Sequence, residues 1–181
     1  MKIKNYKEEL AVPEGTTVQI HKGIVTVSKA KHTLKREFKD PRLSLKMDAN
    51  KIAIELKEMT RREKMLIGTV IAHIKNMLKG VNEPYVYKLK ICSGHFPMNI
   101  TLSGKTLSAK NFVGEKIPRL LEIRDGVEVK IEGMDITVTS ANKELAGQTA
   151  GAIELLCRRP GFDPRIFQQG IYLTEKAGKS A

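Results

Sequence analysis

Aromatic side chains are scarce in this sequence. It has no tryptophan, and only 5% of its 181 residues are aromatic. Proteins that bind single-stranded nucleic acid commonly stack successive bases on exposed aromatic rings. Few residues here are suited to such a platform, so contacts with phosphate groups and recognition of shape would have to dominate any binding to nucleic acid.

Cysteines and long apolar runs are also rare. The two cysteines, Cys92 and Cys157, lie far apart, and the chain opens with a polar stretch rather than an apolar signal core. Disulfides are uncommon in reducing compartments, and a membrane-spanning helix needs about 20 apolar residues. We therefore expect free thiols, a cytoplasmic location and no association with a membrane.

Motifs for catalysis and cofactor binding are missing as well. The sequence has neither the glycine-rich loop that cradles nucleotide phosphates nor the dinucleotide-binding fingerprint. Cys92 and His95 have the spacing of half a zinc site, but the remaining ligands would have to come from Cys157 and scattered histidines. Cys92 and His95 could also act as nucleophile and base, yet nothing marks a third group to orient them. We expect no enzymatic activity, metal, cofactor or small-molecule substrate.

Positive charge is abundant. The chain has 32 lysines and arginines against 20 aspartates and glutamates, which gives a formal net charge of +12. An excess of this size attracts polyanions in a salt-sensitive way. Nucleic acid is therefore the leading candidate for a partner.

One passage of the sequence occurs twice. Residues 11–28 and 122–139 align without a gap, and Gly15, Val18 and Ile20 of the first copy correspond to Gly126, Val129 and Ile131 of the second. Each copy has a turn with an acidic residue and a glycine, a strand with alternate apolar residues, a tight turn and a returning β-branched strand. This pattern predicts the same β-hairpin in both places.

The repeat predicts a duplicated domain. We expect an α+β fold with two tandem domains, residues 1–81 and 82–181, each an antiparallel β-sheet packed with one α-helix. Residues 17–57 alternate as an antiparallel meander. Residues 1–10 are expected to be frayed or to form a short edge strand.

Two helices have clear sequence signals. Thr60 and Glu63 have the spacing of a capping box, and Gly80 is expected to end that helix. Its predicted inward residues are Leu66, Val70, Ile74, Met77 and Leu78. Asn142 is expected to cap the second helix, with Leu145, Thr149, Ile153 and Leu156 inward.

The basic residues fall into two groups. Seven between Lys29 and Lys46 fit the solvated face of an amphipathic sheet as well as they fit an RNA contact. The irregular segment after residue 157 is a stronger candidate, because loops present guanidinium groups freely and arginine binds phosphate bidentately. The predicted RNA-binding residues are Arg158, Arg159 and Arg165, with Lys176 following in the tail and Lys105, Lys110 and Lys116 in loops of the same half.

Four further motifs stand out in the sequence. They are Asn111-Phe-Val-Gly-Glu115, His95-Phe-Pro-Met-Asn99, His73-Ile-Lys-Asn-Met-Leu-Lys-Gly-Val81 and Asp163-Pro-Arg-Ile-Phe-Gln-Gln-Gly-Ile-Tyr172. Together they resemble those of a known family, the large-subunit ribosomal protein numbered six in bacteria and archaea and nine in eukaryotes. The resemblance covers nearly the whole chain, and the chain is similar to the archaeal members of the family. The family's usual Gly-Pro-x-Gly turn after the first hairpin is replaced here by Ser28-Lys-Ala-Lys-His-Thr33.

The resemblance implies a structural, non-catalytic protein of the large ribosomal subunit that supports translation. Family members bind 23S-type rRNA chiefly through the second domain, near the factor-binding centre, the sarcin-ricin loop and the base of the lateral stalk. The implied partners are large-subunit rRNA, neighbouring large-subunit ribosomal proteins and nearby translation factors. The sequence leaves open a free-standing RNA-binding or adaptor protein built from duplicated domains.

Overall fold

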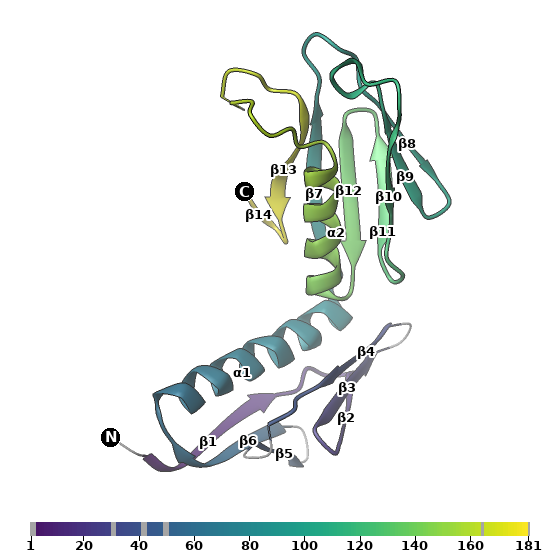
Figure 1. Cartoon of the computed structure of the whole chain (residues 1–181). Helices are drawn as coiled ribbons and strands as arrows, with labels where there is room; N and C mark the ends of the chain where they lie inside the picture. The colour runs from purple at the N-terminus through teal and green to yellow at the C-terminus, as the bar shows by residue number, and fades with distance from the viewer. Residues whose placement is uncertain (1–2, 30–31, 41–42, 49–50, 164, 181) are drawn as a thin grey trace. The chain divides into compact units, whose positions relative to one another are not determined.

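The chain forms two compact units, Met1–Glu83 and Pro84–Ala181. A computed structural model describes residues 3–29, 32–40, 43–48, 51–163 and 165–180. Each unit combines antiparallel strands with one long helix, as Figure 1 shows. The predicted α+β class is therefore confirmed.

Unit 1 contains two three-stranded sheets. One has the order β1 (Ile3–Ala11), β6 (Lys51–Met59) and β5 (Leu43–Asp48), and the other β2 (Thr17–His21), β3 (Ile24–Lys29) and β4 (His32–Glu37). The meander predicted for residues 17–57 is thus divided, because β5 pairs with β6 rather than with β4. The N-terminal segment is an edge strand of nine residues. The turn that departs from the family pattern is centred on residues 30–31, outside the described residues.

Helix α1 (Arg61–Asn82) begins at the predicted capping box. The backbone N–H of Thr60 donates to the Glu63 carboxylate at 2.9 Å. The prediction that Gly80 ends the helix is wrong: Gly80 is buried within it, and the Glu83 N–H still donates to the Lys79 carbonyl at 2.8 Å. Pro84 explains the true end, because a residue before proline is restricted to extended backbone and Glu83 has φ −132° and ψ 112°.

The buried face of α1 differs slightly from the prediction. Val70, Ile74, Met77 and Leu78 are buried as predicted, but Leu66 is 40% exposed. Its place in the core is taken by Ile67 and Ile71, which continue the helical spacing of the buried stripe. Within the described part of the chain, neither helix is long and apolar enough to cross a membrane.

In unit 2, α2 (Lys143–Leu156) packs on one face of a five-stranded sheet, as Figure 1 shows. The strand order is β11 (Glu128–Glu132), β12 (Asp135–Ser140), β7 (Tyr85–Cys92), β13 (Gly170–Lys176) and β14 (Lys179–Ser180). A second sheet has the order β10 (Arg119–Glu122), β9 (Thr106–Lys110) and β8 (Asn99–Ser103), and a short 3-10 turn, η1 (Phe112–Gly114), follows β9. Both sheets and α2 contribute side chains to one apolar core.

The start of α2 follows the sequence prediction, whereas its inward face does so only in part. The Asn142 side chain accepts a hydrogen bond from the Glu144 N–H at 3.0 Å, which confirms the predicted cap. Thr149 and Ile153 are buried, but Leu145 and Leu156 are only partly so. The small residues Ala146 and Ala150 lie in the core instead, which lets the helix approach the sheet closely.

The two copies of the repeat have the same structure. Val18 pairs with Val27 in unit 1, and Val129 pairs with Val138 at the matching place in unit 2. Gly15 and Gly126 precede the hairpins with φ of 74° and 84°, a left-handed conformation that glycine adopts without strain. The predicted hairpin is therefore confirmed in both units.

Candidate nucleic-acid interface

Three segments distant in sequence meet at one end of unit 2. They follow β7, β9 and α2, and we call them together the loop end, defined as residues 93–98, 111–118 and 157–169. The Gln169 side chain donates to the Phe96 carbonyl at 3.2 Å, and the Asn111 side chain donates to the Pro97 carbonyl at 3.0 Å. These hydrogen bonds fix the positions of the segments relative to one another, so the loop end is one ordered surface rather than three independent loops.

Arg119 fixes the position of the segment that leaves α2. Its guanidinium group forms a bidentate ion pair with Glu115, at 2.6 and 2.8 Å. It also donates to the Leu156 carbonyl at 2.8 Å, which is one of the orphan carbonyls at the end of a helix. The same group lies 4.4 Å above the ring of Phe112. One side chain thus holds β10, η1 and the end of α2 in register.

The pair also makes stability depend on pH. Hydrogen bonds from Arg119 hold the pKa of the Glu115 carboxyl below its ordinary value of 4.5. A carboxyl whose pKa is lowered by folding stabilises the protein above its unfolded pKa and stops doing so as the pH falls through the folded one.

We predict that Glu115→Gln lowers the melting temperature of unit 2 near pH 7, because the amide cannot replace the charged partner of Arg119. The difference from the wild type should shrink once the pH falls below about 4.5, where the wild-type carboxyl also becomes neutral. Thermal unfolding of both proteins between pH 3 and 7 measures this. A difference that does not change with pH would contradict an electrostatic role for Glu115.

Four predicted cations lie at the loop end or border it. Arg158 and Arg159 follow α2, Lys116 lies in the loop after η1, and Lys110 ends β9 beside Asn111. All four are exposed, and within the described residues none forms an ion pair with a carboxylate. Their charges are therefore available to an anionic partner.

Two other predicted cations lie at the opposite end of unit 2. Strand β13 begins at Gly170 opposite Cys92 and runs away from the loop end, which places Lys176 about 20 Å along the sheet. Lys105 lies in the turn between β8 and β9, about 15 Å along the strand from Lys110. It forms an ion pair with Asp125, which raises the pKa of the lysine. The expectation that Lys105 extends the surface around Arg158 is therefore wrong.

Arg165 belongs to the loop end but already forms an ion pair with Asp163. Its guanidinium group donates to the Asp163 carboxylate at 2.8 and 3.1 Å, and these hydrogen bonds lower the pKa of that carboxyl. The Arg165 side chain remains 88% exposed. Its charge is partly compensated, so it contributes less to the local positive potential than Arg158 does.

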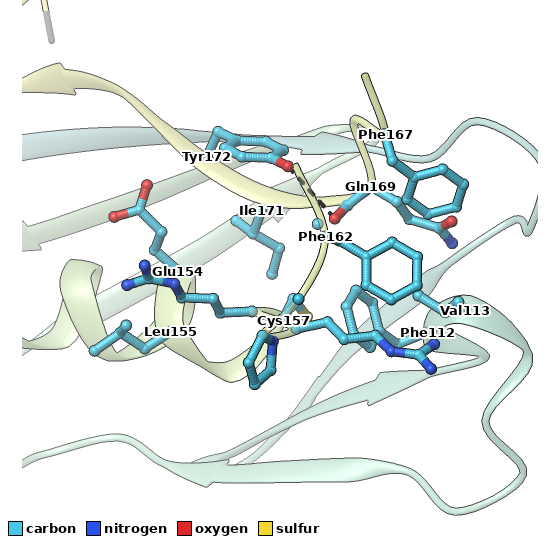
Figure 2. A pocket seen from close by; sticks show the side chains of 15 residues that line it. Phe112, Val113, Glu154, Leu155, Cys157, Phe162, Phe167, Gln169, Ile171 and Tyr172 are labelled. Atoms are coloured by element: carbon cyan, nitrogen blue, oxygen red, sulfur yellow. Dashed lines mark hydrogen bonds between the residues drawn. The ribbon is translucent and has the colours of Figure 1, made fainter. Parts of the chain in front are cut away.

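A pocket opens between the end of α2 and the start of β13. Its volume is about 400 Å³, and Phe112, Phe162, Phe167, Gln169, Ile171 and Tyr172 are among the residues that line it. Figure 2 shows these side chains around the pocket. Phe162 and Phe167 form a tilted ring pair with centroids 5.4 Å apart, and Arg159 lies 4.5 Å above the ring of Phe162.

The inner wall of the pocket contains the buried thiol of Cys157. Burial raises the pKa of that thiol to about 11. Only a thiolate is a good nucleophile or metal ligand. The Cys157 thiol stays protonated near neutral pH and is therefore unreactive. Among the described residues, no three histidine, cysteine, aspartate or glutamate side chains gather where they could hold a metal ion.

Several basic residues of unit 1 make contacts within that unit. Lys29 donates to the Asn82 side chain, Arg36 lies 3.2 Å from a ring nitrogen of His73, and Lys46 forms an ion pair with Glu55 at 3.0 Å. Lys31 and Arg42, which belong to the same predicted group, lie outside the described residues. These contacts favour the interpretation of this group as the outer face of a sheet.

Sequence reasoning missed two residues that organise the loop end, Arg119 and Gln169. Both act over long sequence distances: Arg119 bonds to the end of α2, and Gln169 bonds to Phe96. The motifs 111–115 and 163–172 are the signal that could find them, because the first contains Glu115, the partner of Arg119, and the second contains Gln169.

Comparisons with known proteins agree with this architecture. A family model described as Ribosomal protein L6 matches residues 12–83 and 96–170, one segment in each unit. The chain is 42% identical over 173 residues to the large ribosomal subunit protein uL6 of Methanococcus vannielii, covering 96% of this chain and 95% of the relative. The protein of the same name from Nanoarchaeum equitans is 44% identical over 188 residues, with 99% and 98% covered. That of Methanosarcina mazei is 37% identical over 175 residues, with 97% and 99% covered.

Proposed function

The chain belongs to the ribosomal protein L6 family, in its archaeal form, as its motifs predict, and on this premise we propose that it binds large-subunit rRNA through the loop end of unit 2. It is a structural constituent of the large ribosomal subunit and has no catalytic activity of its own. Its other partners are neighbouring proteins of that subunit in the cytoplasmic ribosome.

The observation that supports RNA binding is the concentration of available positive charge at the loop end. Arg158, Arg159, Lys110 and Lys116 are exposed and, in the part of the chain that the structure describes, free of carboxylate ion pairs. They are presented by segments that Arg119 and Gln169 hold in place. A fixed cluster of cations suits folded RNA, where phosphate groups and 2′-hydroxyls offer a rigid pattern while base edges are hidden in a deep groove.

The family resemblance supports a particular position on the subunit. We propose that the loop end lies near the factor-binding centre, the sarcin-ricin loop and the base of the lateral stalk, where translation factors pass close by. Lys29, Arg36 and Lys46 of unit 1 already have contacts of their own, which is in keeping with a smaller role for that unit in RNA binding.

Sucrose-gradient fractionation of native cell extract tests the function. We expect the chain to migrate with the large subunit at moderate salt and to be released only by washing at high salt, because many phosphate contacts must be broken together. A chain found only in the light fractions at low salt would contradict the proposal. That result would favour a free-standing RNA-binding or adaptor protein built from duplicated domains.

A further inference from the structure

The pocket at the loop end has the properties of a site for a single flat, polar ring. We propose that it holds one unstacked nucleobase of the rRNA, an inference that rests on the proposed function. A volume of about 400 Å³ suits a base with its sugar rather than a longer stretch of chain. Unstacked bases of folded RNA are commonly held on aromatic rings and arginine planes.

The rings of Phe162 and Phe167 supply the stacking surface. They lie 5.4 Å apart on the irregular segment between α2 and β13, and they remain 44% and 37% exposed. Large apolar side chains this exposed have no full role in the core, unlike Phe112, which is 1% exposed. The scarcity of aromatic residues excludes an extended stacking platform, but a site for one base needs only one pair of rings.

Gln169 supplies a hydrogen-bond acceptor in the wall. Its side-chain amide is oriented by the Phe96 carbonyl, which can only accept, so the NH₂ group must face Phe96 and the Oε1 atom must face elsewhere. Gln169 is only 7% exposed, and among the described residues its Oε1 atom has no hydrogen-bond partner. Buried acceptors are normally satisfied, so this atom marks a place for an incoming donor.

A second hollow lies beside this wall. Phe167 and Gln169 also line a second hollow, together with Ile91, Cys92 and Met134, so they form the partition between two spaces. A shift of the Phe167 ring into the second hollow would widen the first and uncover the Oε1 atom. The base then stacks on the rings and donates an N–H from its Watson–Crick edge to Gln169. All four bases carry such a donor, so Gln169 sets the orientation of the base rather than its identity.

The charges at the rim match a flipped-out nucleotide. Arg158 and Arg159 both line the pocket, and the Arg159 guanidinium group lies 4.5 Å above the ring of Phe162. A base that leaves its stack brings the phosphate groups on either side with it, and these groups need cations close to the point of entry. The pocket and the cation cluster therefore act on the same nucleotide.

Chemical probing of deproteinised large-subunit rRNA bound to the full chain tests the inference. Dimethyl sulfate and a carbodiimide report the Watson–Crick edges of unpaired bases, and hydroxyl radicals report the backbone. We expect one unpaired base to become at least about fivefold less reactive when the wild-type protein binds, in line with the strength of base stacking. The variant Phe162→Leu with Phe167→Leu keeps the apolar volume but removes the rings, so it should restore the free reactivity while leaving the backbone footprint unchanged.

The matched control is Ile117→Ala, which removes an 81% exposed apolar side chain of the loop end that lines neither hollow. It should protect the same base as the wild type. If the double variant has a clearly lowered melting temperature, Phe162→Leu alone replaces it in the experiment. The inference is overturned if no base distinguishes the wild type from the folded ring variant, or if that variant loses the backbone footprint as well. Absence of any backbone footprint with the wild-type protein would instead contradict the proposed function.

Discussion

Replacing Arg158 and Arg159 by alanine should weaken binding to large-subunit rRNA by about ten- to a hundredfold at 0.1 M salt. Both side chains are exposed, lie at the loop end and are free of carboxylate ion pairs within the described residues. Each phosphate contact releases about one counterion, so losing two contacts should reduce the slope of log affinity against log salt by about two. Filter binding or fluorescence anisotropy across a salt series measures both quantities.

The structure provides a matched control for this experiment. The pair Lys110→Ala and Lys116→Ala removes two charges at the loop end, whereas Lys105→Ala and Lys176→Ala removes two charges of the same kind at the opposite end of unit 2. The first pair should lower both the affinity and the salt slope, and the second should change them little. Equal effects from the two pairs would mean that only net charge matters, and the loop end would lose its special role.

Replacing Phe112 by alanine should destabilise unit 2 by about 3–5 kcal/mol, the usual cost of deleting a buried aromatic ring. The Phe112 side chain is 1% exposed and packs in the core of unit 2. It also lies under the Arg119 guanidinium group, at 4.4 Å. The substitution therefore leaves a cavity beneath the Arg119 guanidinium group, which holds β10, η1 and the end of α2 together. A domain is typically stable by about 5–15 kcal/mol, so a loss of this size is severe.

Denaturant unfolding of the full chain measures the loss, with Phe162→Ala as the matched control. The ring of Phe162 is 44% exposed, so the same substitution there should cost about 1 kcal/mol or less. We expect the midpoint of the unit 2 transition to fall far more for Phe112→Ala than for Phe162→Ala. Similar losses for both variants would show that the loop end packs differently from the structure described above.

Local interactions explain why parts of the fold could be predicted from sequence. The Thr60–Glu63 capping box, the Asn142 cap and the repeated hairpins each depend on residues close together in the chain. The sequence prediction ends α1 too early because glycine has a general tendency to end helices, whereas Val81, which follows Gly80, has a specific place in the core. Burial of an apolar side chain outweighed the modest cost of glycine in a helix.

The duplicated α+β organisation, the excess of positive charge and the family were fixed by composition, periodicity and motif, because these properties do not depend on how distant segments pack. The functional surface was decided only in three dimensions. Strand pairing carries Lys176 away from the loop end, and the turn between β8 and β9 carries Lys105 to the opposite end from Lys110. Gln169 donates a hydrogen bond to the carbonyl of Phe96, which lies 73 residues earlier in the sequence. Such meetings are set by the order and register of strands in the sheets, which no local pattern of residues encodes.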